Sequence, residues 1–186
     1  MSAEDLLALY EHQTRSLKRR PSLGRASARA RVRLVAETAC EVRHGTLATL
    51  VDLPSDDGGT GTGPHPGELM RACLGSCLVL GYRVWAARLG IPLTNVEIDV
   101  TCEFDTRGQL GLDDDVAVGW ERIVFDVRVE SDAPSADVER LVAHANRLSP
   151  MLANLAKSIS QVHHLTVVKP TPSAPNPKTP STHPNL

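Results

Sequence analysis

The chain has 186 residues, enough for one domain with a sizeable hydrophobic core, and its formal net charge of −2 gives no overall attraction to nucleic acid or anionic membranes. Aromatic residues make up 3% of the chain, so the core must rest mainly on Leu, Val, Ile and Ala. The sequence shows neither a signal peptide nor a membrane span. We therefore expect a cytoplasmic protein whose four cysteines are reduced thiols.

The N-terminal segment combines a predicted helix with a cluster of basic residues. Apolar residues recur on one side of a helix over residues 3–18, which indicates a short amphipathic helix. Eight of the nineteen residues in 15–33 are basic. No aromatic stacking residue or recognition motif accompanies these charges, so binding to nucleic acid is disfavoured. We interpret residues 1–27 as a helix followed by a solvated basic arm.

Two strands are predicted before a long helix. In "ARARVRLVAETA" (28–39), one face of a strand would carry Val32, Leu34 and Ala36 and the other Arg31, Arg33 and Val35, the pattern of a half-buried strand. The stretch "HGTLATLVDLP" (44–54) predicts a second strand, ended by its proline. The loop over 55–65 is rich in glycine but lacks the lysine of a phosphate-binding loop, so it is not interpreted as a nucleotide site.

Residues 66–89 predict a long apolar helix with clear ends. Pro66 suits a first helical turn, and Glu68 lies near the positive end of the helix dipole. Gly90, followed by Pro92, is typical of a helix end. The helix has few polar positions to present to water, so packing against a second copy across a two-fold axis would bury it.

The second half of the chain alternates strands and helices. Residues 94–105 and 121–131 alternate apolar and polar positions, which predicts two strands that pair in antiparallel across an acidic loop. Ser135 is expected to cap a helix, and Pro150 to begin a short one that includes "MLANLAKSI".

The C-terminal part of the chain contains one more predicted strand, "VHHLTVV" (162–168). Residues 170–186 contain six prolines without an apolar pattern, and they predict a disordered tail. The complete order of elements indicates an α+β chain with a mostly antiparallel sheet and a central apolar helix.

Three stretches of the sequence resemble the OsmC/Ohr family, the osmotically induced protein C and organic hydroperoxide resistance proteins. They are "VDLPSDDGGTGTGPHPGELMRACLGSCL" (51–78), "WAARLGIPLTNVEIDVTCEFD" (85–105) and "ANRLSPMLANLAKSI" (145–159). The resemblance covers roughly residues 30–168. It implies an OsmC-like domain over 28–169, in which antiparallel sheets wrap around central apolar helices in an intertwined homodimer.

The resemblance also implies a thiol peroxidase. Cys77 matches the cysteine whose thiolate attacks an organic hydroperoxide and becomes a sulfenic acid. The position that matches the family's second cysteine is Ser149, and a hydroxyl cannot form a disulfide. The expected cycle therefore uses one cysteine, with an external thiol or Cys73 as the reductant of the sulfenic acid.

Two further catalytic residues are expected from the resemblance. The family's glutamate directly after the proline of the helix start is replaced by Gly67, and Glu68 lies one place later. Glu68 and Cys77 are nine residues apart and point in different directions from one helix. For the arginine that activates the thiol, Arg43 is the first candidate and Arg33 the second.

Other interpretations remain open. Cys73 packs in the core unless it serves as a resolving thiol, because residues four apart on an intact helix have poor geometry for a disulfide. His163 and His164 would point to opposite faces of a strand, so no metal site is expected, and no cofactor is implied. The alternative function is a non-catalytic OsmC-like dimer that binds a small apolar ligand.

Overall fold

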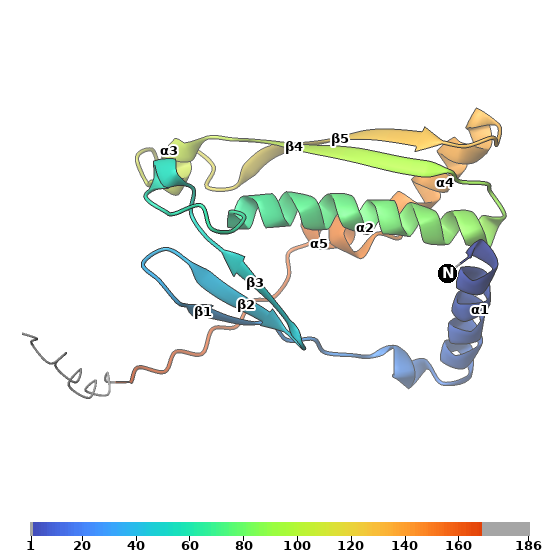
Figure 1. Cartoon of the computed structure of the whole chain (residues 1–186), viewed down its shortest axis with the longest axis horizontal. Helices are drawn as coiled ribbons and strands as arrows, with labels where there is room; N and C mark the ends of the chain where they lie inside the picture. The colour runs from blue at the N-terminus through green and yellow to red at the C-terminus, as the bar shows by residue number, and fades with distance from the viewer. Residues whose placement is uncertain (1, 169–186) are drawn as a thin grey trace, which may run out of the picture.

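The computed structural model describes residues 2–168 as a mixed helical and antiparallel-sheet structure, shown in Figure 1. A three-stranded sheet has the order β1-β2-β3, and β4 pairs with β5 in a second sheet. This architecture confirms the predicted α+β class. The elements are α1 (Ala3–Arg19), η1 (Pro21–Gly24), β1 (Arg31–Leu34), β2 (Cys40–His44), β3 (Leu47–Val51), η2 (Ser55–Asp57), α2 (Pro66–Leu89), β4 (Asn95–Phe104), α3 (Thr106–Gln109), β5 (Trp120–Glu130), α4 (Ser135–Arg147) and α5 (Pro150–Leu155).

The long helix α2 begins and ends where the sequence predicts. Pro66 is its first residue, and Gly90 closes it in the left-handed conformation, with φ of 68°. His65 provides the N-cap, because its Nδ1 accepts the backbone N–H of Gly67 at 3.1 Å. Glu68 completes the cap by accepting the backbone N–H of His65 at 2.9 Å.

The core lies around one face of α2. Leu78 and Tyr82 of α2 pack with Ala145 of α4, and side chains from β4, β5 and α5 surround them. The Tyr82 hydroxyl donates a hydrogen bond of 2.7 Å to Oδ1 of Asn146, which joins α2 to α4. Figure 1 shows the β4–β5 hairpin running along one side of α2. Here Gly75 allows the close approach, since a Cβ at that position would lie 3.2 Å from Val100 Cγ2.

The sheet formed by β1, β2 and β3 makes few contacts with the other elements and stands apart from α2 in Figure 1. Its cross-strand register gives it two different faces. One face is charged. The other is apolar and partly bare, with Val32, Leu34 and Leu47 between 61% and 71% exposed and Val51 buried.

A buried carboxylate fixes the glycine-rich loop between β3 and α2. Asp52 is 1% exposed and accepts six hydrogen bonds from four residues. Thr60 and Thr62 each donate both their hydroxyl and their backbone N–H, and the Thr38 hydroxyl reaches Asp52 from the loop between β1 and β2. These bonds, led by the Thr60 and Thr38 hydroxyls, hold the pKa of Asp52 far below its usual range.

Three predictions about strands need correction. The region before α2 has three strands rather than two. The first predicted strand, over 28–39, forms only over β1, and β2 lies between the two predicted strands. Gly45, with φ of 59°, turns the chain from β2 into β3. The predicted strand over 162–168 is also wrong. These residues are exposed and irregular, and they pair with none of the strands of the described chain. His163 and His164 therefore do not lie on a strand.

Smaller differences concern the helices. Ser135 is the first residue of α4 rather than its cap, because Pro134 occupies the N-cap position without a side-chain hydrogen bond. The short helix α5 ends at Leu155. The predicted disordered tail, 170–186, lies outside the described residues. Within residues 2–168, no helix combines the length and the hydropathy that crossing a membrane requires.

Candidate functional site

The structure brings together the two positions that the sequence singles out for thiol chemistry. Cys77 is half-buried midway along α2, and Ser149 is 4% exposed at the start of α5. The Cys77 Sγ lies 3.7 Å from the Ser149 Oγ, although 72 residues separate them in the chain. This is the one hydrogen-bond partner that Cys77 Sγ has among residues 2–168.

Ser149 has two structural roles at this position. Its Oγ is the N-cap acceptor of α5 and receives the backbone N–H of Leu152 at 3.4 Å. Since the oxygen acts as an acceptor there, the hydroxyl hydrogen is free to be donated toward the Cys77 sulfur. The cap fixes the Ser149 side chain and thus holds its hydroxyl beside the thiol.

The other cysteines on neighbouring elements are less well placed to meet Cys77. Cys73 lies one turn earlier on α2 and is exposed, so within the protomer it does not pack in the core as predicted. An intact helix keeps Cβ atoms at this spacing about 5–6 Å apart, beyond the usual span of a disulfide. Cys102 lies on β4. Gly75 packs against β4, and Cys77 is about 200° further around the helix, so it faces away from Cys102. Burial raises the pKa of Cys102, and the nearby Arg71 offsets this only in part.

Glu68 acts as a helix cap in this structure. Its carboxylate is exposed and accepts the backbone N–H of His65. The nine residues between Glu68 and Cys77 correspond to about 13 Å along the helix axis. The geometry of one protomer therefore does not bring Glu68 to the thiol.

Arg43 has an acidic partner of its own. Its Nε and Nη2 donate to the two carboxylate oxygens of Glu41 at 2.7 and 2.9 Å, which is a bidentate ion pair. Arg33 reaches the same carboxylate at 3.5 Å. Both arginines lie on the charged face of the β1–β3 sheet, and neither is brought to Cys77 within the protomer. An activating role for either one stays a prediction.

Two surface hollows of the protein lie away from Cys77. One, of about 290 Å³, is lined by Arg31, Arg33, Glu41 and Arg43 on the β1–β3 sheet. The other, of about 300 Å³, lies on the β4–β5 hairpin. Among residues 2–168 no three His, Cys, Asp or Glu side chains are arranged to hold a metal ion. Within one protomer, Cys77 therefore lies outside both hollows.

Sequence reasoning missed two polar features of the fold. Asp52 was not singled out, although "DGGTGTG" after it contains the threonines that bind its carboxylate. His144 was also missed. It meets the Trp85 ring edge-on at 4.3 Å between centroids, and its buried Nε2 has no partner among the described residues. The i, i+3 spacing of His144 and Arg147 gave a signal for their contact, which is 3.3 Å long.

Comparisons with known proteins agree on one family. The family described as OsmC-like protein matches residues 59–163. An OsmC-like protein from Mycoplasma pneumoniae has a similar structure, with a TM-score of 0.62, 14% identity, and coverage of 70% of this chain and 88% of that one. A putative osmotic stress induced and detoxification response protein from Psychrobacter arcticus 273-4 gives a TM-score of 0.55, 14% identity, and coverage of 69% and 88%. An organic hydroperoxide resistance protein OsmC from Legionella pneumophila gives 0.51, 18% identity, and coverage of 70% and 89%. No curated protein sequence matches the chain. The family match spans more than half of the chain and agrees with its fold, and the chain therefore belongs to the OsmC-like protein family.

Proposed function

We propose that this protein is a thiol-dependent peroxidase of organic hydroperoxides with Cys77 as its nucleophile. The observation that carries the proposal is the contact between Cys77 Sγ and Ser149 Oγ at 3.7 Å. The contact joins the two positions that the family resemblance assigns to the reacting cysteines. The hydroperoxide resistance protein from Legionella pneumophila, with the same fold, supports the same class of substrate.

The first step is a two-electron oxidation of the sulfur. The Cys77 thiolate attacks the terminal oxygen of the hydroperoxide, an S–O bond forms, and the O–O bond breaks. The leaving alkoxide takes up a proton and departs as an alcohol, which leaves a sulfenic acid on Cys77. The Ser149 hydroxyl is placed to hydrogen-bond the sulfur before this step and the sulfenic acid after it.

The second step depends on the hydroxyl at Ser149. Because it cannot form a disulfide, an external thiol condenses with the sulfenic acid, releases water and leaves a mixed disulfide on Cys77. A second thiol molecule then releases the Cys77 thiol and a small disulfide. A cytoplasmic location would supply such thiols in reduced form. Cys73 could replace the first external thiol only if α2 unwinds locally.

We also propose that the protein works as a homodimer. The stripe of α2 that includes Leu69, Cys73, Ser76 and Leu80 is exposed, with Leu80 at 65%. The apolar face of the β1–β3 sheet is bare as well. A second copy would cover both surfaces, and exposed apolar areas of this kind mark interaction sites. Light scattering that gave the mass of one chain would contradict this part of the proposal.

Intact-mass analysis tests the peroxidase directly. The reduced protein is treated with one equivalent of tert-butyl hydroperoxide and quenched over time, beside the variants Cys77→Ser and Cys102→Ser. We expect one added oxygen atom in the native chain and in Cys102→Ser, and no addition in Cys77→Ser. A loss of two hydrogen atoms would instead show an internal disulfide. The proposal fails if none of the three changes mass within minutes.

The alternative function is a non-catalytic dimer that binds a small apolar ligand. It is favoured by one observation: Arg43, the first candidate for the activating arginine, is engaged by Glu41 and is not brought to Cys77 within the protomer. An unreactive Cys77 in the mass experiment, combined with a dimer in solution, would support this alternative.

A further inference from the structure

The two surface hollows of the protein carry opposite charges. Each lies on an antiparallel sheet, and the sheets stand on opposite sides of α2 in Figure 1. The chain as a whole is close to neutral, so the separation of charge into two patches is a local feature.

The basic hollow is built from two cross-strand pairs on β1 and β2. Arg31 lies opposite Arg43, and Arg33 lies opposite Glu41. Glu41 binds both Arg43 and Arg33, but Arg31 has no acidic partner among residues 2–168. Three guanidinium groups and one carboxylate give the hollow a net charge of +2. Two like charges directly opposite each other destabilise a sheet.

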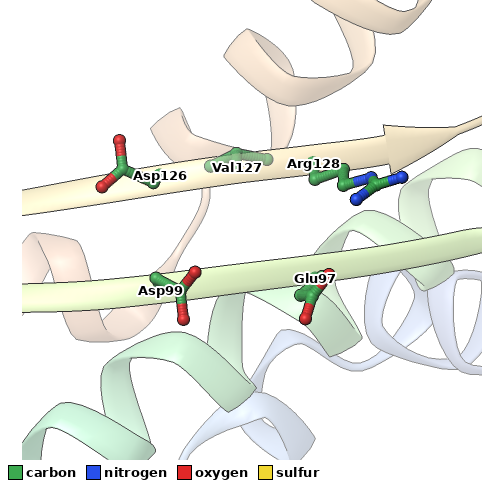
Figure 2. Close-up of a pocket in the computed structure, with 5 residues that line it drawn as sticks. All are labelled: Glu97, Asp99, Asp126, Val127 and Arg128. Atoms are coloured by element: carbon green, nitrogen blue, oxygen red, sulfur yellow. The ribbon is translucent and has the colours of Figure 1, made fainter.

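The acidic hollow has the reverse arrangement on β4 and β5. Asp99 lies opposite Asp126, and Glu97 lies opposite Arg128. Figure 2 shows the four charged side chains side by side along the two strands. All four are exposed, and none of them has a hydrogen bond or ion pair to another residue of the described chain. Three carboxylates and one guanidinium give a net charge of −2.

We propose that the basic hollow of one molecule docks on the acidic hollow of a second copy. Both hollows contain one like-charge pair, with a mixed pair two residues along each strand. Directly opposite residues have the same Cβ spacing in both sheets, about 4.5–5.5 Å. The Arg31–Arg43 pair can therefore face the Asp99–Asp126 pair, and each like-charge repulsion is offset by an attraction.

A second copy fits these hollows better than another partner because both halves of the contact are present on one chain. The two hollows have net charges of equal size and opposite sign. The contact cannot form within one chain, since α2 lies between the two sheets (Figure 1). It joins different surfaces of the two copies, so it can add further copies beyond a dimer.

The proposed dimer leaves this contact available. It covers the apolar face of the β1–β3 sheet, and the basic hollow lies on the opposite face. An activating role for Arg43 would require the charged face of the β1–β3 sheet to lie against Cys77 instead. That role and docking through the basic hollow therefore exclude each other. The docking contact does not depend on the peroxidase proposal, and its test measures assembly rather than activity.

Sedimentation velocity of the full chain at several ionic strengths tests the proposal. We expect assemblies larger than the basic oligomer near 0.01 M salt, where the Debye length is about 30 Å, and their loss near 1 M, where it is about 3 Å. Arg31→Glu and Asp126→Arg each reverse one charge of the contact. Either variant alone should weaken the association about tenfold or more. Arg29→Glu and Glu139→Arg make the same charge changes at exposed positions outside the hollows and serve as controls.

Mixing the two hollow variants gives the sharpest result. The acidic hollow is intact in Arg31→Glu and the basic hollow is intact in Asp126→Arg, so the two variants can form the native contact with each other and the mixture should recover the association that each variant lacks. The proposal is overturned if the native chain shows no salt-dependent assembly, or if the controls weaken assembly as much as the hollow variants. It is also overturned if Arg31→Glu weakens binding to a DNA duplex while assembly stays unchanged, since the basic hollow would then serve nucleic acid.

Discussion

Replacing Ser149 with cysteine should convert the proposed one-cysteine cycle into a two-cysteine cycle. Ser149→Cys places a second sulfur where the Oγ now lies 3.7 Å from Cys77 Sγ. After a hydroperoxide oxidises Cys77, the new thiol can attack the sulfenic acid, release water and form an internal disulfide. The variant should therefore lose two hydrogen atoms, whereas the native chain gains one oxygen atom.

The magnitude of the effect on stability follows from the chain separation of the two residues. A cross-link that closes a 72-residue loop removes unfolded-state entropy equivalent to about 4.4 kcal/mol at 25 °C, as an upper value. Against this, the substitution removes the Ser149 hydroxyl that caps α5, which costs about 1 kcal/mol. The reduced variant should be less stable than the native chain, and the oxidised variant more stable by up to about 3 kcal/mol.

Intact mass and chemical denaturation, each with and without a reductant, measure both effects. Ser149→Ala is the matched control, because it removes the cap without adding a thiol and its stability should not depend on the reductant. The double variant Cys77→Ser, Ser149→Cys should form no internal disulfide. If Ser149→Cys gains an oxygen atom and never cross-links, the two side chains are not in the contact that the structure shows, and the reasoning is wrong.

Three further substitutions test how the fold is held together. Asp52→Asn should make the free energy of unfolding less dependent on pH in acid. The lowered pKa of Asp52 means that its carboxylate stabilises the native chain above about pH 4 and that this stabilisation is lost as the pH falls below it. Chemical denaturation at several pH values would show the difference. Tyr82→Phe should lower the free energy of unfolding by about 1 kcal/mol. In a double-mutant cycle with Asn146→Ala, the two losses should not be additive, and additive losses would rule out the hydrogen bond between the two side chains. Gly75→Val should lower the free energy of unfolding by about 1–3 kcal/mol, measured by thermal unfolding. Adding Val100→Ala to this variant should restore part of the loss only if α2 and β4 are as close as described.

The parts of the fold that follow local rules were predictable from the sequence. The bounds of α2 agree with the prediction because Pro66 and Gly90 favour a helix start and a helix end whatever surrounds them. The β4–β5 hairpin follows from strict alternation of apolar and polar residues. The turn at Gly45 was missed because the residues before it, 41–44, are mostly charged or polar and the glycine itself was its only local signal. The strand over 162–168 failed for a different reason, since a strand needs a neighbour and apolar alternation does not supply one.

The candidate site was predictable only in part. The resemblance singled out Cys77 and Ser149, but their contact depends on how α5 returns to α2, which no local pattern encodes. The pairing of Arg43 with Glu41 had a local signal, because residues two apart on a strand share a face. The structural role of Asp52 had a partial signal in the threonines of the loop after it, but the Thr38 donor comes from before it in the chain.

The distribution of buried residues links the proposed dimer to the stability of the fold. Eight apolar residues of the described chain are buried, which is few for a chain of this length, while α2 and the β1–β3 sheet each leave an apolar face bare. If a second copy supplies the missing burial, assembly and folding are one equilibrium, and the stability depends on protein concentration. The midpoint of unfolding should then fall on dilution, and variants must be compared at equal concentration. A midpoint that is independent of concentration would mean that the small core around Leu78 and Tyr82 holds the protomer by itself.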